Sequence, residues 1–205
     1  MAKKISSSER LPARDRLLAA AESLFYEEGF NTVGIDRVIE RAGVAKASLY
    51  DCFGSKEELI RSYLLARQEA RQTRITEGLK RYDTPRARLL GFFDLLGEQI
   101  AQPGFKGCAF VKAGNEARPG SSVRGVCQDS RQWLRDLLTE LAVEAGAADP
   151  QALAQQFVML YDGASVSAQL DNRREAAASA RTVATALLDA ALAPGAPAQA
   201  ELPAV

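Results

Sequence analysis

The chain has 205 residues, of which 47% are hydrophobic and 25% are charged, a balance typical of a globular protein with one core or two small ones. Its 26 basic and 26 acidic side chains leave a formal net charge of zero, so any basic surface must arise from placement and not from total charge. The absence of histidine removes the commonest general base and metal ligand. We therefore expect no metal, no cofactor and no enzymatic activity.

Three cysteines, an odd number, indicate free thiols and not a disulfide framework. No apolar run approaches the length of about 18 residues that a membrane-spanning helix needs. The charged first residues also lack the apolar segment of a secretion signal. We expect a cytoplasmic protein with no membrane partner.

The predicted fold class is all-α, with about nine helices. Residues 1–10 are polar and are expected to form a disordered arm, and residues 193–205 are rich in Ala and Pro and are expected to form a flexible tail. Between them the pattern predicts a three-helix DNA-binding domain over residues 11–55. A helical domain for ligand binding and dimerisation is predicted over residues 56–192.

The first predicted helix begins at Pro12, because proline suits the first helical position, and ends at Gly29. Its apolar residues recur with helical spacing, so they are expected to brace the two helices that follow. These residues are Leu17, Leu18, Ala21, Leu24 and Phe25.

The next short stretch decides the predicted function. Apolar residues at i, i+3, i+4 and i+7 run from Ile35 to Ala42 and predict a two-turn helix. Gly43 follows, where a chain leaving a helix often turns left-handed. A second short helix buries Leu49 and Phe53 and leaves its polar side free. Two such helices, too short to be stable alone, are typical of a helix-turn-helix that enters the DNA major groove.

The residues predicted to contact DNA differ in the part of the duplex that each can bind. The lysines offer phosphate contacts, the tyrosine a hydroxyl or a ring for the backbone, and the short side chains a hydroxyl or a methyl for base edges. The lysine at the start of the fourth helix also lies where backbone amides attract an anion. The predicted DNA-binding residues are Thr32, Lys46, Ala47, Ser48, Tyr50 and Lys56.

Several short pieces around this stretch are more specific together than any one of them is alone. They are Gly29-Phe30, Ala42-Gly43-Val44, Ser48-Leu49-Tyr50, Phe53 and Ser55-Lys56-Glu57-Glu58-Leu59. Together they resemble the N-terminal half of a tetracycline-repressor (TetR) family transcription factor, over roughly residues 12–64. The resemblance implies an all-helical homodimer with an N-terminal DNA-binding domain and a C-terminal effector domain. Ala45 departs from the family, which often has a serine cap there, and Cys52 stands where His or Tyr is common.

Ser55 and Glu58 form a capping-box pattern at the start of the fourth helix, which is predicted to continue to about Tyr82 and to join the two domains. Thr84 and Pro85 then suit the cap and the first position of the next helix. The remaining helices are predicted over residues 86–102, 107–116, 123–145, 150–170 and 174–192.

The last two predicted helices carry faces of small and apolar side chains. Small residues let helix axes approach closely, and a helix-turn-helix protein needs two copies to read a two-fold site. We therefore expect a homodimer formed by a four-helix bundle of these helices. The predicted dimer-interface residues are Phe157, Ala164, Ala180, Ala184, Leu187 and Leu188.

An effector pocket is expected among the fifth to eighth helices, although most aromatic residues there will belong to the core. The predicted ligand-binding residues are Phe93, Cys108, Phe110, Asn115, Trp133 and Tyr161. The segment Gly107-Cys108-Ala109-Phe110-Val111 also resembles a TetR subfamily that includes thiol-based electrophile sensors. A helix N-terminus activates a thiol, but a buried small hydrophobe is the other interpretation of Cys108.

The sequence thus predicts a ligand-responsive transcriptional regulator. The favoured form is a repressor that binds a palindromic double-stranded DNA operator as a homodimer and is released by a small-molecule effector. One alternative is a thiol-based electrophile or oxidant sensor that acts through Cys108 or Cys52. A more remote alternative is a helical interaction protein without regulated DNA binding.

Overall fold

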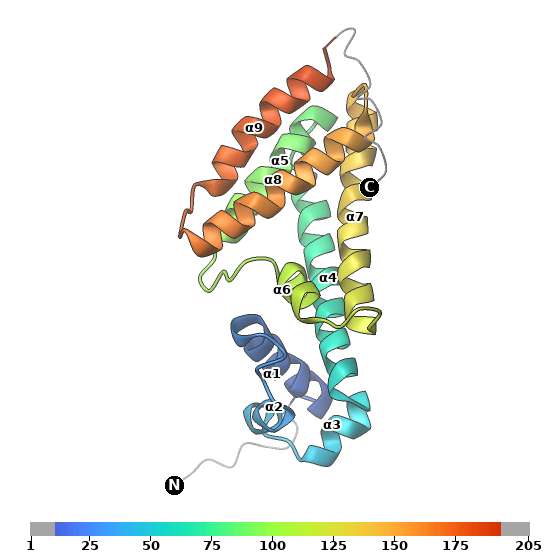
Figure 1. The fold of residues 1–205 in the computed structure, drawn as a ribbon, viewed down its shortest axis with the longest axis vertical. Coiled ribbons are helices and arrows are strands. Elements are labelled where there is room, and N and C mark those ends of the chain that lie inside the picture. The colour runs from blue at the N-terminus through green and yellow to red at the C-terminus, as the bar shows by residue number, and fades with distance from the viewer. Residues whose placement is uncertain (1–10, 194–205) are drawn as a thin grey trace. The chain divides into compact units, whose positions relative to one another are not determined.

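The computed structural model describes residues 11–193, and within this range the chain forms nine helices (Figure 1). This confirms the predicted all-α fold class. The predicted arm at residues 1–10, and all but the first residue of the predicted tail, lie outside the described residues. The helices are α1 (Ala13–Glu28), α2 (Ile35–Ala42), α3 (Lys46–Phe53), α4 (Lys56–Leu79), α5 (Pro85–Ile100), α6 (Ala109–Glu116), α7 (Ser122–Ala145), α8 (Pro150–Leu170) and α9 (Ala176–Ala191).

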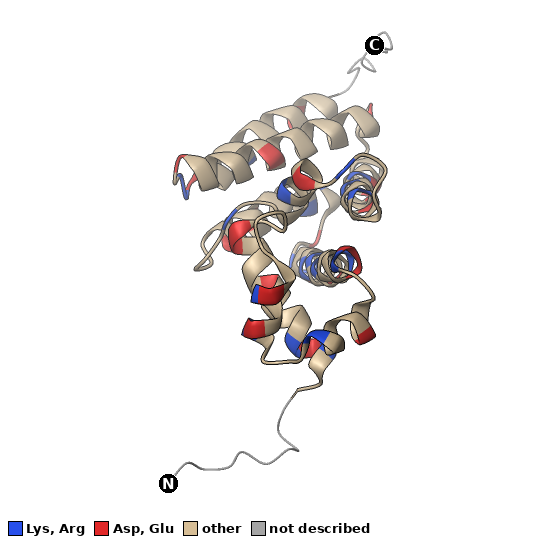
Figure 2. Ribbon diagram, turned by 60° about the horizontal axis from the view of Figure 1, so that its bottom comes forward, with Lys and Arg blue, Asp and Glu red and all other residues tan. Residues whose placement is uncertain are grey.

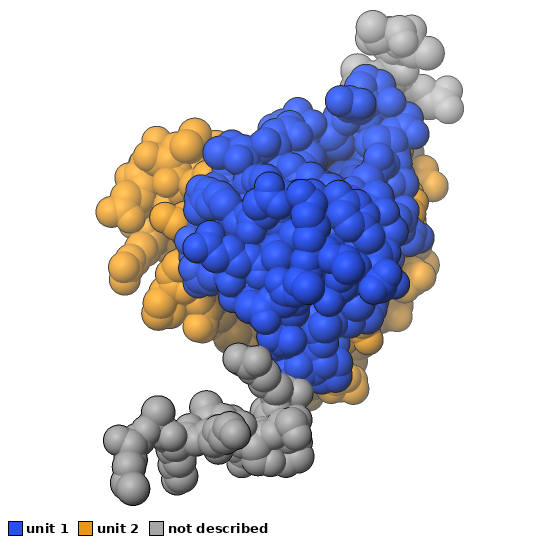
Figure 3. All heavy atoms as spheres, turned by 90° about the horizontal axis from the view of Figure 1, so that it is seen from below, with its two compact units in different colours: residues 1–67, 109–127 blue, residues 68–108, 128–205 orange. Residues whose placement is uncertain are grey.

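The chain divides into two compact units, which Figure 3 shows in different colours. Unit 1 contains Met1–Arg67 and Ala109–Cys127, and unit 2 contains Gln68–Cys108 and Gln128–Val205. The helices α4 and α7 therefore each contribute residues to both units. None of the helices in the described range is long and apolar enough to cross a membrane. The functional boundary predicted after residue 55 stays a prediction, since the compact units divide the chain at other points.

Each of the helices α1 to α4 contributes at least one fully buried side chain to the core of unit 1. Leu17, Val38, Leu49 and Leu59 are all inaccessible to solvent. Burying an aliphatic side chain of this size stabilises a fold by about 1.5–3 kcal/mol. The apolar spacing of the sequence thus has its expected effect, because α2 and α3 each pack against α1.

The core of unit 2 is aromatic and lies between α5 and α8. The ring of Phe93 meets the ring of Phe157 edge to face, with centroids 5.3 Å apart. The ring of Phe92 stacks on the ring of Tyr161 at 5.2 Å. The helix α9 covers α5 and α8 and buries Ala184 and Leu188 against them.

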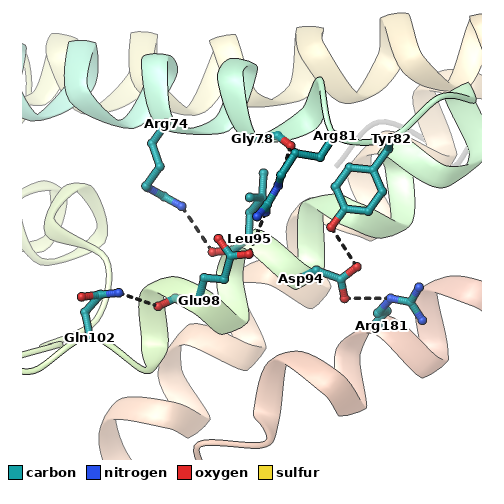
Figure 4. Close-up of polar contacts among 9 residues, drawn as sticks. All are labelled: Arg74, Gly78, Arg81, Tyr82, Asp94, Leu95, Glu98, Gln102 and Arg181. Carbon is teal, nitrogen blue, oxygen red and sulfur yellow. Dashed lines mark hydrogen bonds and ion pairs between the residues drawn. The ribbon is translucent and has the colours of Figure 1, made fainter.

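The helix α4 ends at Leu79, earlier than the expected end at Tyr82. The amides of residues 80–82 bond to carbonyls three residues back, which tightens the last turn. This turn places Tyr82 against α5, where a Cβ added at Gly91 would lie 2.4 Å from the Tyr82 ring. The Tyr82 hydroxyl donates to Asp94 at 3.2 Å, as Figure 4 shows. The helix α4 therefore ends just before Tyr82, the residue that packs against α5.

The caps predicted for α5 are present. The hydroxyl of Thr84 accepts a hydrogen bond from the amide of Ala87 at 3.1 Å, and Pro85 occupies the first turn. The N-terminus of α8 is capped in the same way, because the Asp149 carboxylate accepts a hydrogen bond from the Ala152 amide at 2.9 Å. A cap of this kind stabilises a helix by about 1 kcal/mol.

Candidate nucleic-acid interface

The turn between α2 and α3 depends on Gly43, which adopts the left-handed conformation at φ 61° and ψ 45°. Its amide donates to the Glu40 carbonyl at 3.1 Å, and the Val44 amide donates to the Ile39 carbonyl at 3.3 Å. These bonds satisfy carbonyls that the end of α2 would otherwise leave without partners. The prediction of a glycine turn at this position is confirmed.

A residue that the sequence analysis did not identify, Arg16 of α1, secures this turn from outside. Its Nη1 donates to the carbonyls of Ala42 at 3.0 Å and Gly43 at 2.8 Å. A cation at the C-terminal end of a helix also interacts favourably with the helix dipole. Arg16 thus ties α1 to the point where the chain changes direction.

A second arginine, which belongs to α2 itself, also links this helix to α1. Arg37 donates to both carboxylate oxygens of Glu28 in α1, at 2.7 and 2.9 Å. The hydrogen bond from Arg37 lowers the pKa of Glu28 below its usual value. Both side chains are exposed, so this bidentate pair fixes geometry more than it adds stability.

The helix α3 begins without a side-chain cap, because Ala45 has none to offer. Its orientation comes from the burial of Leu49 and Phe53. The guanidinium of Arg14 in α1 also lies over the Phe53 ring, 5.3 Å from its centroid. The helix α3 therefore packs through one face, and its other face is exposed to solvent.

The structure places most of the predicted DNA contacts on that available face. Lys46, Ala47 and Tyr50 are exposed on α3, and Ser48 is half-buried beside them. Thr32 is exposed in the loop before α2. The short side chains and the amphipathic tyrosine thus lie where a duplex can reach them, and the assignment of contacts stays a prediction.

Charge on this unit is mixed, and Figure 2 shows acidic as well as basic residues on its helices. Lys46 pairs with Asp36 of α2 through an Nζ–Oδ1 distance of 3.1 Å, with both side chains well exposed. An exposed pair of this kind is worth only about 0–1 kcal/mol. A DNA phosphate can therefore take the place of Asp36 at little cost.

Lys56, the other predicted phosphate contact, is already engaged within unit 1. Its Nζ donates to the Phe30 carbonyl at 2.7 Å. Burial lowers the pKa of Lys56, and the nearby Glu116 carboxylate opposes this effect. Lys56 thus helps to fix the loop before α2, and its contact with phosphate stays a prediction.

The helix α6 packs with this DNA-binding motif inside unit 1. The Glu116 side chain accepts from the Asn31 amide at 2.8 Å, and its carbonyl accepts from Asn31 Nδ2 at 3.1 Å. Gly29 allows this approach, because a Cβ there would lie 2.5 Å from a Glu116 oxygen. Lys112 donates to the Tyr26 carbonyl at 2.6 Å. The end of α6 is therefore built into the loop that carries Thr32.

The predicted ligand-binding residues are divided between the two units. Phe93, Cys108, Trp133 and Tyr161 belong to unit 2, and Phe110 and Asn115 belong to unit 1. Phe93 lies in the closed aromatic core, Phe110 and Tyr161 are buried, Cys108 and Trp133 are half-buried and Asn115 is exposed. Their role as one pocket stays a prediction.

The predicted dimer residues mostly belong to the core of unit 2. All except the half-buried Leu187 are buried within the single chain, Ala184 completely. The exposed apolar residues of α8 and α9 are others: Met159, Val166, Leu170 and Val183. A groove of about 260 Å³ runs between the two helices and is lined in part by Met159, Gly163, Ser167 and Val183.

Two short helices, a left-handed glycine between them and an exposed face on the second define a helix-turn-helix DNA-binding protein. Residues 17–63 match a family model described as "Bacterial regulatory proteins, tetR family". The transcriptional regulator AcuR of Cereibacter sphaeroides is 30% identical over 176 residues, which cover 78% of each chain. This chain belongs to the TetR family of transcriptional regulators.

Other comparisons agree with this assignment. The HTH-type transcriptional repressor NemR of Escherichia coli is 29% identical over 79% of this chain and 86% of its own length. The crystal structure of a TetR-family regulator from Streptomyces coelicolor superposes with a TM-score of 0.84 at 31% identity, over 88% of this chain and 96% of that one. The reduced form of Escherichia coli NemR gives a TM-score of 0.75 at 26% identity, over 85% and 97% of the two chains. The family assignment confirms a regulator and not an enzyme.

We expect Arg16→Met to lower the free energy of unfolding of the DNA-binding unit by about 1–2 kcal/mol, since two carbonyls at the end of α2 lose their donor. Urea unfolding followed by far-UV circular dichroism measures this change. Tryptophan fluorescence is less suitable, because the single tryptophan, Trp133, lies in unit 2.

The matched control is Arg41→Met. Arg41 is an exposed arginine of α2 whose hydrogen bond to the Ser23 hydroxyl is long at 3.3 Å. We expect it to change stability by less than about 0.5 kcal/mol. Equal stability of the two variants would contradict the role given to Arg16.

Proposed function

We propose that this regulator is a repressor that binds a palindromic operator as a homodimer and leaves it when a small-molecule effector binds. The observation that carries the proposal is the exposed face of α3, where Lys46, Ala47 and Tyr50 stand opposite the buried Leu49 and Phe53. A recognition helix needs this arrangement to lie in the major groove. One relative, NemR, is named as a repressor.

The exposed apolar side chains of α8 and α9 support the homodimer. Leu170 and Met159 are 73% and 65% exposed. Val166 and Val183 add to the same two helices, which also form the groove between them. Adjoining apolar residues at a surface are typical of a protein interface. A dimer through these helices supplies the second recognition helix that a palindromic site requires.

We expect Lys46→Ala to weaken binding to every operator sequence by on the order of 1 kcal/mol, because one phosphate contact is lost. The dependence of log Kd on log salt concentration should flatten by about one unit. Fluorescence anisotropy with operator DNA at several salt concentrations measures both quantities.

The control for this experiment is Asp36→Asn, which removes the acidic partner of Lys46 and leaves the lysine in place. It should tighten binding. If the wild-type protein retains no DNA in a sequence-selection experiment, the operator proposal fails outright.

We expect Val183→Glu to separate the subunits and leave each one folded, because Val183 is 48% exposed in the single chain. An unpaired charge in an apolar interface costs about 3–5 kcal/mol. Light scattering should report a monomer, while circular dichroism should retain the helical signal. In contrast, Ala184→Glu places its charge in the core of unit 2, where Ala184 is 0% exposed, and should unfold that unit. A dimeric Val183→Glu protein would place the interface elsewhere.

A thiol sensor is the second candidate function, and the surroundings of Cys108 favour it. Cys108 is half-buried and lies close enough to Arg131 and Tyr161 to interact with both electrostatically. The hydrogen bond to Asp162 is the main cause that raises the pKa of Arg131, and Cys108 adds to it. Arg131 is thus a cationic neighbour of this thiol, and cysteine reacts with electrophiles as the thiolate. The resemblance of this segment to thiol-based sensors points in the same direction.

We expect Cys108→Ser to abolish release of operator DNA by thiol reagents if this second function operates. Gel-shift assays of Cys108→Ser and Cys52→Ser, with and without N-ethylmaleimide, separate the possibilities. If only Cys52→Ser is insensitive, an adduct on α3 blocks DNA locally. If both variants still release DNA, the thiol function is excluded and reversible ligand binding remains.

A further inference from the structure

A pocket of about 320 Å³ lies within unit 1, beside the DNA-binding motif. Its lining comes from the loop before α2, from the first turns of α4, and from the end of α6 with the connection to α7. This volume is at the lower end of the range of roughly 300–1,000 Å³ that small-molecule sites occupy. None of the predicted ligand-binding residues, which all belong to the described range, lines this pocket. The pocket therefore suits a small ligand and is separate from the predicted effector pocket.

Part of the lining is apolar and almost fully buried. Ile60 of α4 is 5% exposed and Val123 of α7 is 3% exposed. Ala117, in the connection between α6 and α7, is also buried. Apolar surface that leaves water on binding contributes roughly 25 cal/mol per Å². A ligand with a hydrocarbon group therefore gains affinity from these side chains.

Two charged side chains of the lining bond to the two ends of one peptide group. Lys56 Nζ donates to the Phe30 carbonyl at 2.7 Å, and Glu116 Oε2 accepts from the Asn31 amide at 2.8 Å. This carbonyl and this amide belong to the same planar peptide group, and they point in opposite directions because the described range contains no cis peptide bond. The ammonium group and the carboxylate are thus held at opposite ends of a short polar unit.

Both charged groups have capacity for a further partner. The ammonium group of Lys56 has three N–H donors, and a carboxylate such as that of Glu116 can accept about four hydrogen bonds. The Glu116 carboxylate acts on Lys56 electrostatically, but the two side chains form no ion pair within residues 11–193. They are therefore opposite charges in one pocket that a single ligand can bridge.

The other charges of the lining are also of both signs. Arg118 is exposed and adds a cation. Glu57 adds a carboxylate, which accepts from the Ser122 hydroxyl at 2.8 Å. A ligand with only a negative charge would face two carboxylates, and one with only a positive charge would face two cations. A zwitterion instead meets an opposite charge at each end.

We propose that this pocket binds an α-amino acid with an apolar side chain. The ligand carboxylate accepts from Lys56 Nζ, and the ligand ammonium group donates to the Glu116 carboxylate. The hydrocarbon side chain packs against Ile60 and Val123. Hydrogen bonds between ionised groups are roughly twice as strong as neutral ones. This inference goes beyond the proposed function, since the ligand binds in the DNA-binding unit and its binding requires neither operator nor effector.

The spacing of the two charged groups supports an α-amino acid in particular. The oxygen and nitrogen of a peptide group are joined through one carbon atom, and the carboxylate oxygen and nitrogen of an α-amino acid are joined through two. The ligand therefore spans nearly the same distance as the peptide group that Lys56 and Glu116 already hold between them. An amino acid with its amino group farther along the chain would be too long for the same two contacts.

The experiment titrates the free full-length protein with L-leucine and with three molecules that each lack one part of it. Isocaproate lacks the amino group, isoamylamine lacks the carboxylate, and glycine lacks the side chain. Calorimetry and thermal unfolding measure binding without DNA, at ligand concentrations up to about 10 mM. We expect leucine to bind and to raise the Tm. Each of the other three should bind at least about tenfold more weakly, because it loses a charged partner or the apolar contact.

Glu116→Gln gives the sharpest result, because glutamine keeps an oxygen for the Asn31 amide and removes only the charge. It should weaken leucine binding by about tenfold, abolish the preference for leucine over isocaproate, and leave the Tm of the free protein nearly unchanged. A carboxylate with a purely structural role would lower the Tm and keep that preference. Lys56→Met should abolish the preference for leucine over isoamylamine, and circular dichroism checks that this variant is folded.

Glu27→Gln is the matched control. Glu27 is an exposed glutamate of α1 that belongs to the same unit and does not line the pocket. The Glu27→Gln protein should bind leucine like the wild type, so that a loss seen only in Glu116→Gln is assigned to the pocket.

The inference is overturned if leucine does not bind, if isocaproate or isoamylamine binds as well as leucine, or if Glu116→Gln binds leucine like the wild type. Operator binding is measured separately by gel shift without added ligand. Operator binding without leucine binding would reject the amino-acid site and leave the proposed repressor function standing. Leucine binding without operator binding would retain the site and reject the repressor function.

Discussion

The geometry of the DNA-binding motif depends on one left-handed residue and the arginine that secures it. Gly43 sets the direction in which the chain enters α3, and Arg16 holds two consecutive carbonyls where the turn begins. The helix α3 has eight residues and no side-chain cap at Ala45, so it cannot be stable by itself. Its orientation is a property of what it packs against. The exposed face that carries Lys46 and Tyr50 keeps its orientation because α1 packs against the opposite face.

The parts of this structure that follow from apolar spacing could be predicted, and the parts that follow from polar partners could not. The stripe from Ile35 to Ala42 and the glycine after it specify α2 and its turn by local rules. Arg16 gives no such signal, because an arginine on the polar side of a helix has the same pattern whether it is solvated or bonded. Glu116 and Asn31 are 85 residues apart in sequence, and no periodicity connects them.

The same limit explains the dimer residues. A stripe of alanine and leucine along α9 predicts burial but does not identify the partner, since close packing on α5 and α8 requires the same small side chains as an interface between subunits. Ala184 is buried by its own chain. The discriminating feature is exposure after folding, which leaves Met159 and Val183 as surface apolar residues. Sequence spacing therefore predicts α8 and α9 themselves, whereas the side chains that stay exposed on them are identified only from the structure.

The net charge of zero does not show how the charged side chains differ in their surroundings. On the DNA-binding unit, the pair of Lys46 with Asp36 is weak because both groups are in water. In unit 2, the part-buried Arg74 donates hydrogen bonds to two neutral acceptors, the Leu95 carbonyl and Gln99 Oε1. Lys46 can therefore exchange Asp36 for another anion, whereas Arg74 already has its hydrogen-bond acceptors within unit 2.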